Sequence, residues 1–406
     1  MEVFDPRWHD TGRSGYRSYC VLLQCRGEDG DGDGGDAVPS QRLRSAVRRR
    51  PADFYWLALQ VGWEIPGSIV PPLLPGLDSF SPPSLSPRNV HGETAEDAAS
   101  RTEFNLWINR IVRHPELGDA PSLWTFLRAD DGALDEAKAA SDVRVSDRGE
   151  QPIISRARRL ADRVRARAAT VILWSENELL IEEAEAYVAG LEGTVLALSK
   201  CARRLGEIRT VRDSSIRSMA DGFSDIFTGD FPGVGLSRQL YLAKFMAKVK
   251  KVMYRLSTKE AEQGYKGNTE FEGAVQDLER EVHSVRMAIQ RRHDVQLNHT
   301  HNARKVLNLK HERGYLRDHE VDDYMKEQID VMMEEIKSAE DAAIKSRKEF
   351  VQASERLLRE EERYLPKIEA SIREVLSIWA SAQILHNTRA SDGWGQLLPC
   401  LELADE

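Results

Sequence analysis

Positive side chains gather in three stretches of the chain, of which the first could hold a phosphate group and the other two could contact an anionic membrane surface. The first stretch, 42–50, reads RLRSAVRRR and is followed by Pro-Ala-Asp-Phe. The planar fork of an arginine can hold one phosphate through two parallel, charge-assisted hydrogen bonds. A run of charge is also typical of a solvated strand. The residues alone therefore leave a phosphate site and a solvated strand both open.

The second basic stretch is 152–170, which reads PIISRARRLADRVRARAAT. Its apolar residues recur at helical spacing, and arginines surround that stripe. The arginines are Arg156, Arg158, Arg159, Arg163, Arg165 and Arg167. This pattern predicts a basic amphipathic helix over 151–175 that lies in an anionic membrane interface, where each basic residue contributes about 1 kcal/mol. The alternative is an ordinary helix packed on its neighbour.

The third basic stretch lies in the distal part of a long helical segment, where acids are few. Its members are Arg286, Arg291, Arg292, Arg304, Lys305, Lys310, Arg313 and Arg317. We single out Arg291, Arg292, Arg304 and Lys305 as candidate membrane-surface residues, because a curved dimer would gather such charges onto one face. A solvated coiled-coil flank is the alternative.

Catalytic and metal-binding chemistry find little support. His293, His299, His301 and His311 are close in sequence, but residues two apart on a helix do not face each other, and no cysteine or carboxylate completes a site. No Ser/His/Asp or Cys/His grouping stands out. We expect a protein that is not an enzyme and has neither a metal nor a cofactor.

Composition sets further bounds. The 406 residues favour two modules, and 41% apolar content is enough for folded cores. The net charge of −9 argues against a nucleic-acid partner. The four cysteines are scattered, as is typical of free thiols in a reducing compartment. Because the sequence lacks a spanning apolar run and a secretory start, a cytoplasmic location is expected.

The first 130 residues predict a mixed fold. A strand is expected over 16–24, followed by a hairpin with a loose acidic tip. Amphipathic patterns predict helices over 53–63 and 101–112, the second ended by a His-Pro pair. Between these helices, prolines keep 70–75 extended.

The remainder predicts long helices. Residues 130–150 are polar and serve as a linker. Three helical stretches follow, broken at 228–235 and more weakly at 313–318. Apolar residues three or four apart form a coiled-coil seam in the last stretch, at Ile329, Met332, Ile336, Ala339, Ala343 and Phe350. Such helices extend on the order of 70 Å or more.

Several motifs in order carry a family resemblance. Arg49-Arg50-Pro-Ala-Asp-Phe is followed by PGSIVPPLLP at 66–75, by WINRIVRHP at 107–115 and by Phe126-Leu127. Together they resemble a PX domain, an α+β fold with a small antiparallel sheet plus helices, over 1–129.

The second part resembles the all-α BAR-type three-helix coiled coil that follows the PX domain in sorting nexins. The likeness rests on the three-helix layout, on the glycine-rich break, on 361–364 (EERY) and on the late Trp379. The resulting division is 1–129 for the PX-like domain, 130–150 for the linker, 151–175 for the basic helix, 176–388 for the helical domain and 389–406 for a tail.

The resemblance to PX-BAR sorting nexins implies a lipid site. Arg50 occupies the position that grips the 3-phosphate of a phosphoinositide, with Arg49 and Arg101 as further candidates. The family's stacking aromatic, lysine and helix arginine are replaced here by Pro51, Gly76 and Ser100. These departures predict weak binding that needs help from the basic stretches.

The implied function is phosphoinositide- and curvature-dependent membrane binding in endosomal sorting and tubulation. The implied partners are membranes containing phosphatidylinositol 3-phosphate, retromer, and a second copy or a related chain bound through the helices. A coiled-coil scaffold whose PX-like domain binds protein rather than lipid remains the alternative.

Overall fold

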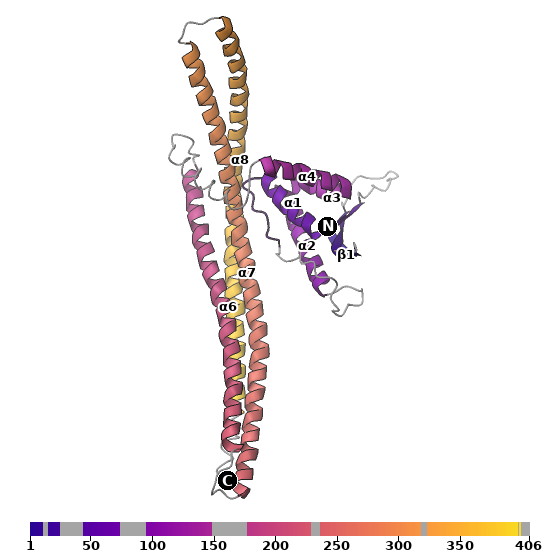
Figure 1. The fold of residues 1–406 in the computed structure, drawn as a ribbon, viewed down its shortest axis with the longest axis vertical. Helices are drawn as coiled ribbons and strands as arrows, with labels where there is room; N and C mark the ends of the chain where they lie inside the picture. Colours follow the sequence, from indigo (N-terminus) through magenta and orange to yellow (C-terminus); the bar gives the residue numbers. More distant parts are fainter. Residues whose placement is uncertain are drawn as a thin grey trace, which may run out of the picture. The chain divides into compact units, whose positions relative to one another are not determined.

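The computed structural model describes residues 1–10, 15–24, 44–73, 95–147, 177–228, 236–317, 323–396 and 398. The chain divides into two compact units, each built from stretches distant in the sequence. The first comprises Met1–Ala186 and Ser284–Glu362, and the second comprises Tyr187–His283 and Arg363–Glu406. The elements from β1 to α4 form a small domain within the first unit (Figure 1).

A three-stranded antiparallel sheet in the order β1-β2-β3 opens the small domain. Its strands are β1 (Glu2–Asp10), β2 (Gly15–Gln24) and β3 (Arg44–Arg49). Tyr19, Val21 and Leu23 alternate along β2 and are buried, as one covered face of a sheet requires. The β2–β3 pairing confirms the predicted hairpin. Its predicted acidic tip lies outside the described residues.

Two helices share one hydrophobic core with the sheet. They are α1 (Pro51–Glu64), which begins with a proline suited to a first helical turn, and α2 (Ala95–Arg113), which ends before His114-Pro115 as predicted. Phe54 of α1 and Phe104 of α2 stack with centroids 4.1 Å apart in the core. The mixed sheet-and-helix domain confirms the predicted α+β class.

The proline-rich turn after α1 is held inside the protein. The indole Nε1 of Trp107 donates to the carbonyl oxygen of Pro71 at 2.9 Å, and Ile69 and Val70 are buried. Gly67 adopts a φ of +91°, a backbone conformation that favours glycine. The turn is therefore a fixed part of the fold rather than a loose connection.

Most of the segment predicted as a linker over 130–150 is instead helical, from Asp131 to Asp147, and 148–150 lie outside the described residues. The one-turn η1 (Leu117–Asp119) and α3 (Pro121–Arg128) lead into α4 (Asp131–Asp147). Leu134 of α4 is buried, and Trp56 Nε1 of α1 donates to Ser141 Oγ at 2.9 Å. Because these partners come from other elements, the polar composition of the segment gave no sign of them.

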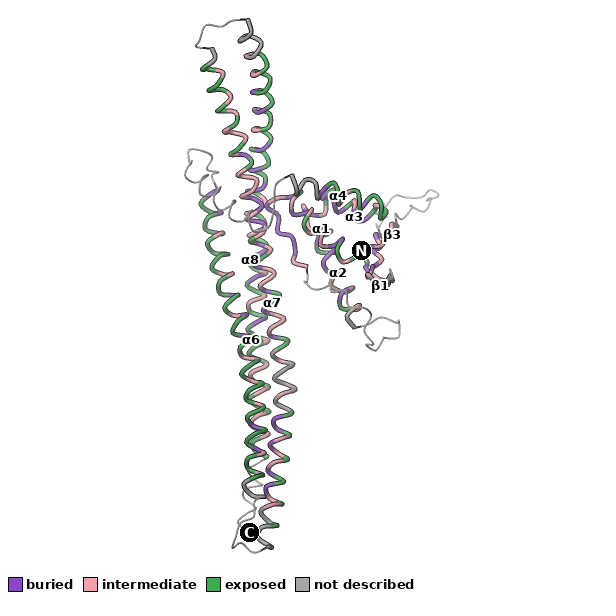
Figure 2. The backbone as a smooth tube through the Cα atoms, in the orientation of Figure 1, coloured by how far each residue is buried: buried purple, intermediate pink, exposed green. Residues whose placement is uncertain are grey.

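Three long helices make up the second part and confirm the predicted three-helix layout. They are α6 (Glu178–Thr228), α7 (Leu236–Arg317) and α8 (Asp323–Gly395). Each contributes residues to both units. Buried and exposed positions alternate along them, whereas buried positions are concentrated inside the small domain (Figure 2). Of the predicted seam, Ile336, Ala339 and Phe350 are buried.

In the second unit α6 and α7 pack through a small apolar cluster. Ile216 and Ala220 of α6 belong to it with Met246, Val249 and Met253 of α7. The helix α8 continues to Gly395, so the segment predicted as a tail from 389 begins as helix. Among the described helices, none has a stretch both long and apolar enough to cross a bilayer.

Candidate functional site

The guanidinium of Arg48 is hydrogen-bonded to residues of the sheet. Its guanidinium donates to Ser18 Oγ at 2.9 Å and to Asp5 Oδ2 at 2.8 Å. The hydrogen bond from Arg48, supported by the charges of Arg48 and Arg7, outweighs burial and lowers the pKa of Asp5. Arg48 therefore fixes β1 and β2 against β3.

Arg49 has a fully buried side chain that binds backbone rather than solvent. It donates to the carbonyl oxygens of Phe126 at 2.7 Å, Arg48 at 2.8 Å and Ala129 at 2.5 Å. Burial lowers its pKa, and neighbouring carboxylates such as Asp53 partly offset that effect. This geometry supports a structural role, joining β3 to the end of α3, in place of the predicted phosphate contact.

Arg50 differs from both neighbours because its side chain is exposed. Its guanidinium carbon lies 4.3 Å from the centroid of the Tyr16 ring. Its backbone N–H donates to Asp53 Oδ2 at 2.6 Å, and Lys138 Nζ of α4 donates to Asp53 Oδ1 at 2.5 Å. The backbone at Arg50 is thus fixed, and its side chain rests on an aromatic face.

Tyr16 is not among the site residues predicted from the sequence. Tyr16 faces His9 across the β1–β2 pairing, and their rings stack with centroids 4.6 Å apart and an interplanar angle of 14°. His9 Nε2 is 2.7 Å from Ser18 Oγ. The signal that could have found Tyr16 was its register opposite His9, which a single sequence does not reveal.

Arg101 lies near the start of α2 and is partly exposed, whereas Ser100 is buried. One turn earlier, Asp97 pairs with Arg17 of β2 at 2.9 Å. Since Arg17 follows Tyr16, this ion pair brings the first turns of α2 to the end of the sheet where Arg50 lies. Gly76 and the arginines of 151–175 lie outside the described residues.

Arg291 is 6% exposed and is removed from the predicted membrane surface. Its guanidinium occupies the space that a Cβ at Gly62 of α1 would fill. Burial lowers the pKa of Arg291 to about 10, with Asp294 partly offsetting the effect. Arg291 thus packs α7 against α1, and a membrane contact would require it to leave that position.

Arg292 is likewise buried rather than surface-exposed. It donates through Nη1 to Glu178 Oε1 at 2.9 Å and through Nη2 to the other carboxylate oxygen, and its Nε donates to Ser354 Oγ at 3.1 Å. Burial would raise the pKa of Glu178, but the hydrogen bonds and charge of Arg292 outweigh it and lower that pKa. Arg292 therefore holds α6, α7 and α8 together, and only Lys305 and partly exposed Arg304 remain from this predicted set.

A second basic surface was missed by the sequence reading. It consists of exposed side chains in α7 at Lys244, Lys248, Lys251 and Arg255. Their spacing of four, three and four residues places them on one helical face. The spacing of these four residues is visible in the sequence, whereas the exposure of their side chains is known only from the structure.

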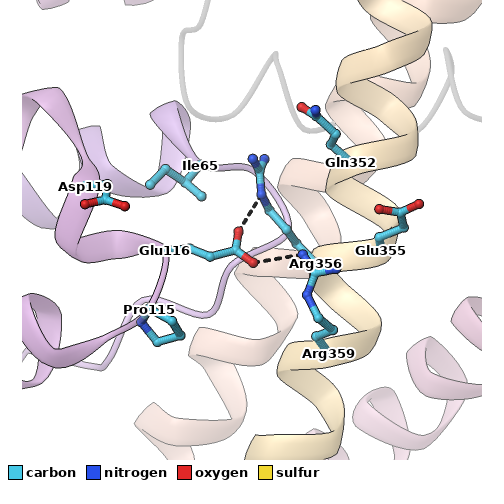
Figure 3. A pocket seen from close by; sticks show the side chains of 8 residues that line it. All are labelled: Ile65, Pro115, Glu116, Asp119, Gln352, Glu355, Arg356 and Arg359. Carbon is cyan, nitrogen blue, oxygen red and sulfur yellow. Dashed lines mark hydrogen bonds and ion pairs between the residues drawn. The ribbon is translucent and has the colours of Figure 1, made fainter.

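Within the first unit, the small domain contacts α8 through charged side chains. Glu116 forms an ion pair with Arg356 Nε at 2.5 Å and accepts a hydrogen bond from Arg359 Nη2 at 2.9 Å, as drawn in Figure 3. They border a cavity of about 450 Å³. Its lining residues are Ile65, Pro115, Glu116, Asp119, Gln352, Glu355, Arg356 and Arg359.

Beside this cavity lies a buried carboxylate, Glu360, which is 1% exposed. His114 Nε2 lies 2.9 Å from Glu360 Oε2, and the N–H of Ile69 donates to the same oxygen at 3.4 Å. His114 Nδ1 accepts from the N–H of Leu117 at 3.1 Å, which assigns the donated ring proton to Nε2. Glu360 thus joins two turns of the small domain to α8.

In the described parts of the chain, no three His, Cys, Asp or Glu side chains lie close enough together to hold a metal ion. His299 has a structural environment there. It is buried, stacks on Phe350 with centroids 6.0 Å apart, and has Nδ1 3.3 Å from Ser346 Oγ.

Comparison with known proteins adds three similarities. Residues 174–400 match the family described as Vps5 C-terminal-like. Sorting nexin 1 of Arabidopsis thaliana is 29% identical over 137 residues, which are 33% of this chain and 29% of that protein. The match thus spans less than a third of that relative. The cryo-EM structure of the SNX-BAR Mvp1 tetramer is similar with a TM-score of 0.53 and 15% identity, over 98% of this chain and 100% of that one.

Proposed function

The chain belongs to the Vps5-like PX-BAR sorting nexins, and from that membership we propose a non-enzymatic role as a peripheral membrane protein. Membership of this family supports a role in membrane-associated sorting and tubulation. We propose more narrowly that this chain binds phosphoinositide-containing, curved endosomal membranes from the cytoplasm. The observation that carries the lipid proposal is the exposed, aromatic-supported guanidinium of Arg50.

Arg50 is the proposed phosphate ligand because its neighbours are already engaged. Arg48 and Arg49 donate to protein oxygens, so a headgroup would have to displace strong internal hydrogen bonds to reach them. Arg101, at the same end of the sheet, is proposed as a secondary contact. Phosphatidylinositol 3-phosphate is the lipid that this site is proposed to prefer.

The long helices are proposed to supply dimerisation and a second membrane contact. Lys244, Lys248, Lys251 and Arg255 present positive charge on one helical face, which attracts an anionic surface. The segment 151–175 remains part of the proposal as a basic amphipathic helix. Retromer, and a homodimer or heterodimer partner, are proposed from the family alone.

Vesicle co-sedimentation tests the lipid site. Wild-type protein is compared with Arg50→Ala on vesicles of equal charge that contain either phosphatidylinositol 3-phosphate or phosphatidylserine. We expect Arg50→Ala to lose the preference for the phosphoinositide while binding to phosphatidylserine falls far less, because a fork depends on phosphate position and diffuse attraction does not.

Arg110→Ala is the matched control, since Arg110 is an exposed arginine on α2 and its loss removes the same charge. Equal effects of the two variants on both vesicle types would reduce Arg50 to a surface charge. Wild-type protein that sediments with neither vesicle would favour the alternative of a scaffold whose small domain binds protein.

A further inference from the structure

Three planar side chains from three chain segments meet at an end of the sheet, where two of them are stacked. His9 of β1 stacks on Tyr16 of β2 at 4.6 Å, and the guanidinium of Arg50, between β3 and α1, lies 4.3 Å from the Tyr16 centroid. His9 is itself placed by Ser18 Oγ at 2.7 Å. The stacked His9–Tyr16 pair is therefore held on the sheet, and the exposed guanidinium of Arg50 lies against the Tyr16 ring.

Stacking engages the face of a guanidinium and leaves its N–H donors free at the edge. The five donors lie in the guanidinium plane, so an aromatic ring below that plane does not compete with a phosphate beside it. Within the described parts of the chain no acceptor engages the Arg50 guanidinium, whereas Arg48 and Arg49 donate to protein oxygens. Tyr16 thus restricts the orientation of Arg50 without occupying its donors.

The main chain beneath the stack is fixed as well. Asp53 accepts from the N–H of Arg50 at 2.6 Å and from Lys138 Nζ at 2.5 Å. With its backbone held, the remaining freedom of Arg50 lies in a long side chain that would otherwise sample many rotamers. Contact with the Tyr16 ring reduces the number of conformations that the Arg50 side chain samples, which lowers the cost of ordering it on binding.

We propose that Tyr16, supported by His9, is a positioning residue that aims the Arg50 fork at one phosphate monoester of an inositol ring. The inference rests on the proposed lipid site and assigns its positional preference to this stack. A fork held in one orientation distinguishes where on the ring the phosphate sits, while a mobile charge responds to net charge alone. Tyr16 should therefore affect preference more than total membrane binding.

The test replaces the ring and keeps the strand. Tyr16→Ile and Tyr16→Thr both suit a β-strand but offer no aromatic face, whereas Tyr16→Phe keeps the face and loses only the hydroxyl. Full-length proteins are compared on charge-matched vesicles containing phosphatidylinositol 3-phosphate or phosphatidylserine. Soluble inositol 1,3-bisphosphate is added as a competitor, which separates recognition of the headgroup from recognition of the lipid surface.

We expect Tyr16→Ile and Tyr16→Thr to reduce the ratio of phosphoinositide to phosphatidylserine binding about fivefold, the scale of an exposed cation–π contact with some added ordering. Tyr16→Phe should retain the wild-type ratio, and all variants should bind phosphatidylserine vesicles equally. The soluble headgroup should compete against wild type and Tyr16→Phe more strongly than against the other two. Melting curves establish that each variant is folded.

Ring-less variants that keep the wild-type ratio would overturn the inference and leave the lipid site in place. Loss of the ratio in Tyr16→Phe as well would also overturn it, because the hydroxyl rather than the stacking face would then be responsible. If the wild type binds both vesicle types equally, the proposed lipid site itself is overturned, and the role of Tyr16 with it.

Discussion

Arg48, Arg49 and Arg50 are adjacent and carry the same charge, yet the structure gives each a different environment. Along β3 successive side chains point to opposite faces, so Arg48 and Arg49 cannot share one surface. Arg49 is buried under backbone carbonyls of Phe126 and Ala129, while Arg50 begins the turn into α1 and is exposed. The sequence identified the basic run, but it could not separate these roles, since the partners of Arg48 are 30 and 43 residues away and those of Arg49 are 77 and 80 residues away.

Arg291 and Arg292 show the same limit. Their charge favoured a surface position, because arginine is rarely buried without a partner. Arg292 has such a partner in Glu178, which is 114 residues distant in the sequence. Arg291 is accommodated by the missing side chain of Gly62. Neither feature has a periodic signal, so local pattern could not place these residues.

The Glu178–Arg292 pair should be essential to the packing of α6 on α7 and α8. Arg292→Met removes one partner and leaves a buried carboxylate, which is expected to cost about 3–5 kcal/mol of unfolding free energy. Arg373→Gln is the control, because the Arg373–Glu369 pair is exposed and contributes under about 1 kcal/mol. Urea unfolding followed by circular dichroism measures both variants.

The same pair predicts an acid response. The lowered pKa of Glu178 means that its stabilising contribution is complete above the unfolded value of about 4.3 and is lost as pH falls through the folded value. Unfolding free energies measured from pH 6 to pH 3 should decline less in Glu178→Gln than in wild type. Parallel declines would show that the carboxylate charge of Glu178 contributes nothing.

Gly67 tests the contact between the small domain and α8. Gly67→Ala places a Cβ against the Ala353 carbonyl oxygen at a positive φ, which should cost about 1–3 kcal/mol and loosen the docking. Hydrogen exchange should rise across residues 353–360. Gly190→Ala is the matched control, since no atom lies within 4 Å of its added Cβ, and it should be neutral or slightly stabilising. Unchanged exchange in Gly67→Ala would show that the docking does not depend on this contact.

Among the elements, strands and helices with clear periodicity were predictable and α4 was not. The alternation of apolar and polar residues in β2 and the amphipathic patterns of α1 and α2 predicted where these elements lie in the sequence. The segment that forms α4 has few large apolar residues, and its one fully buried leucine, Leu134, is too little for a pattern. Its helix depends on tertiary partners, notably Lys138 on Asp53 and Ser141 under Trp56.

Leu134→Ala should therefore release α4 from the small domain. Removing a buried leucine costs about 2–5 kcal/mol, and Leu134 is the buried hydrophobic residue among the side chains of α4 that the structure describes. Amide exchange in 131–147 should accelerate strongly while β1 to β3 stay protected. Glu136→Ala, at an exposed position of the same helix, should leave exchange unchanged. A protected α4 in Leu134→Ala would mean that its polar contacts alone hold it.

For the whole molecule, the order of a PX-like domain before three long helices was predictable because each resemblance supported the other. That two chains pair through these helices is a prediction from the sequence. Large apolar side chains are exposed on α6 and α8 within the described residues, and water disfavours them. They include Leu179, Leu180, Leu196, Val211, Ile344, Leu376 and Ile384.

We predict that the region 176–388 is an obligate dimer, because such surface needs a partner. Sedimentation equilibrium of the full chain at tens of micromolar, the scale of ordinary dimer affinities, should give a dimer mass. Val211→Lys and Ile344→Lys, both on exposed apolar positions, should shift the equilibrium toward monomer. A folded wild-type chain that remains monomeric would exclude a dimeric curved surface.

We propose that this chain remodels phosphoinositide-containing membranes, and electron microscopy of liposomes tests this proposal most directly. Wild-type protein at saturating coverage is added to large vesicles containing phosphatidylinositol 3-phosphate and phosphatidylserine. We expect tubules of uniform diameter with the wild-type protein, and far fewer tubules with Arg50→Ala at equal protein concentration. Vesicles that remain spherical although the dimer has bound them would contradict a curvature-generating role.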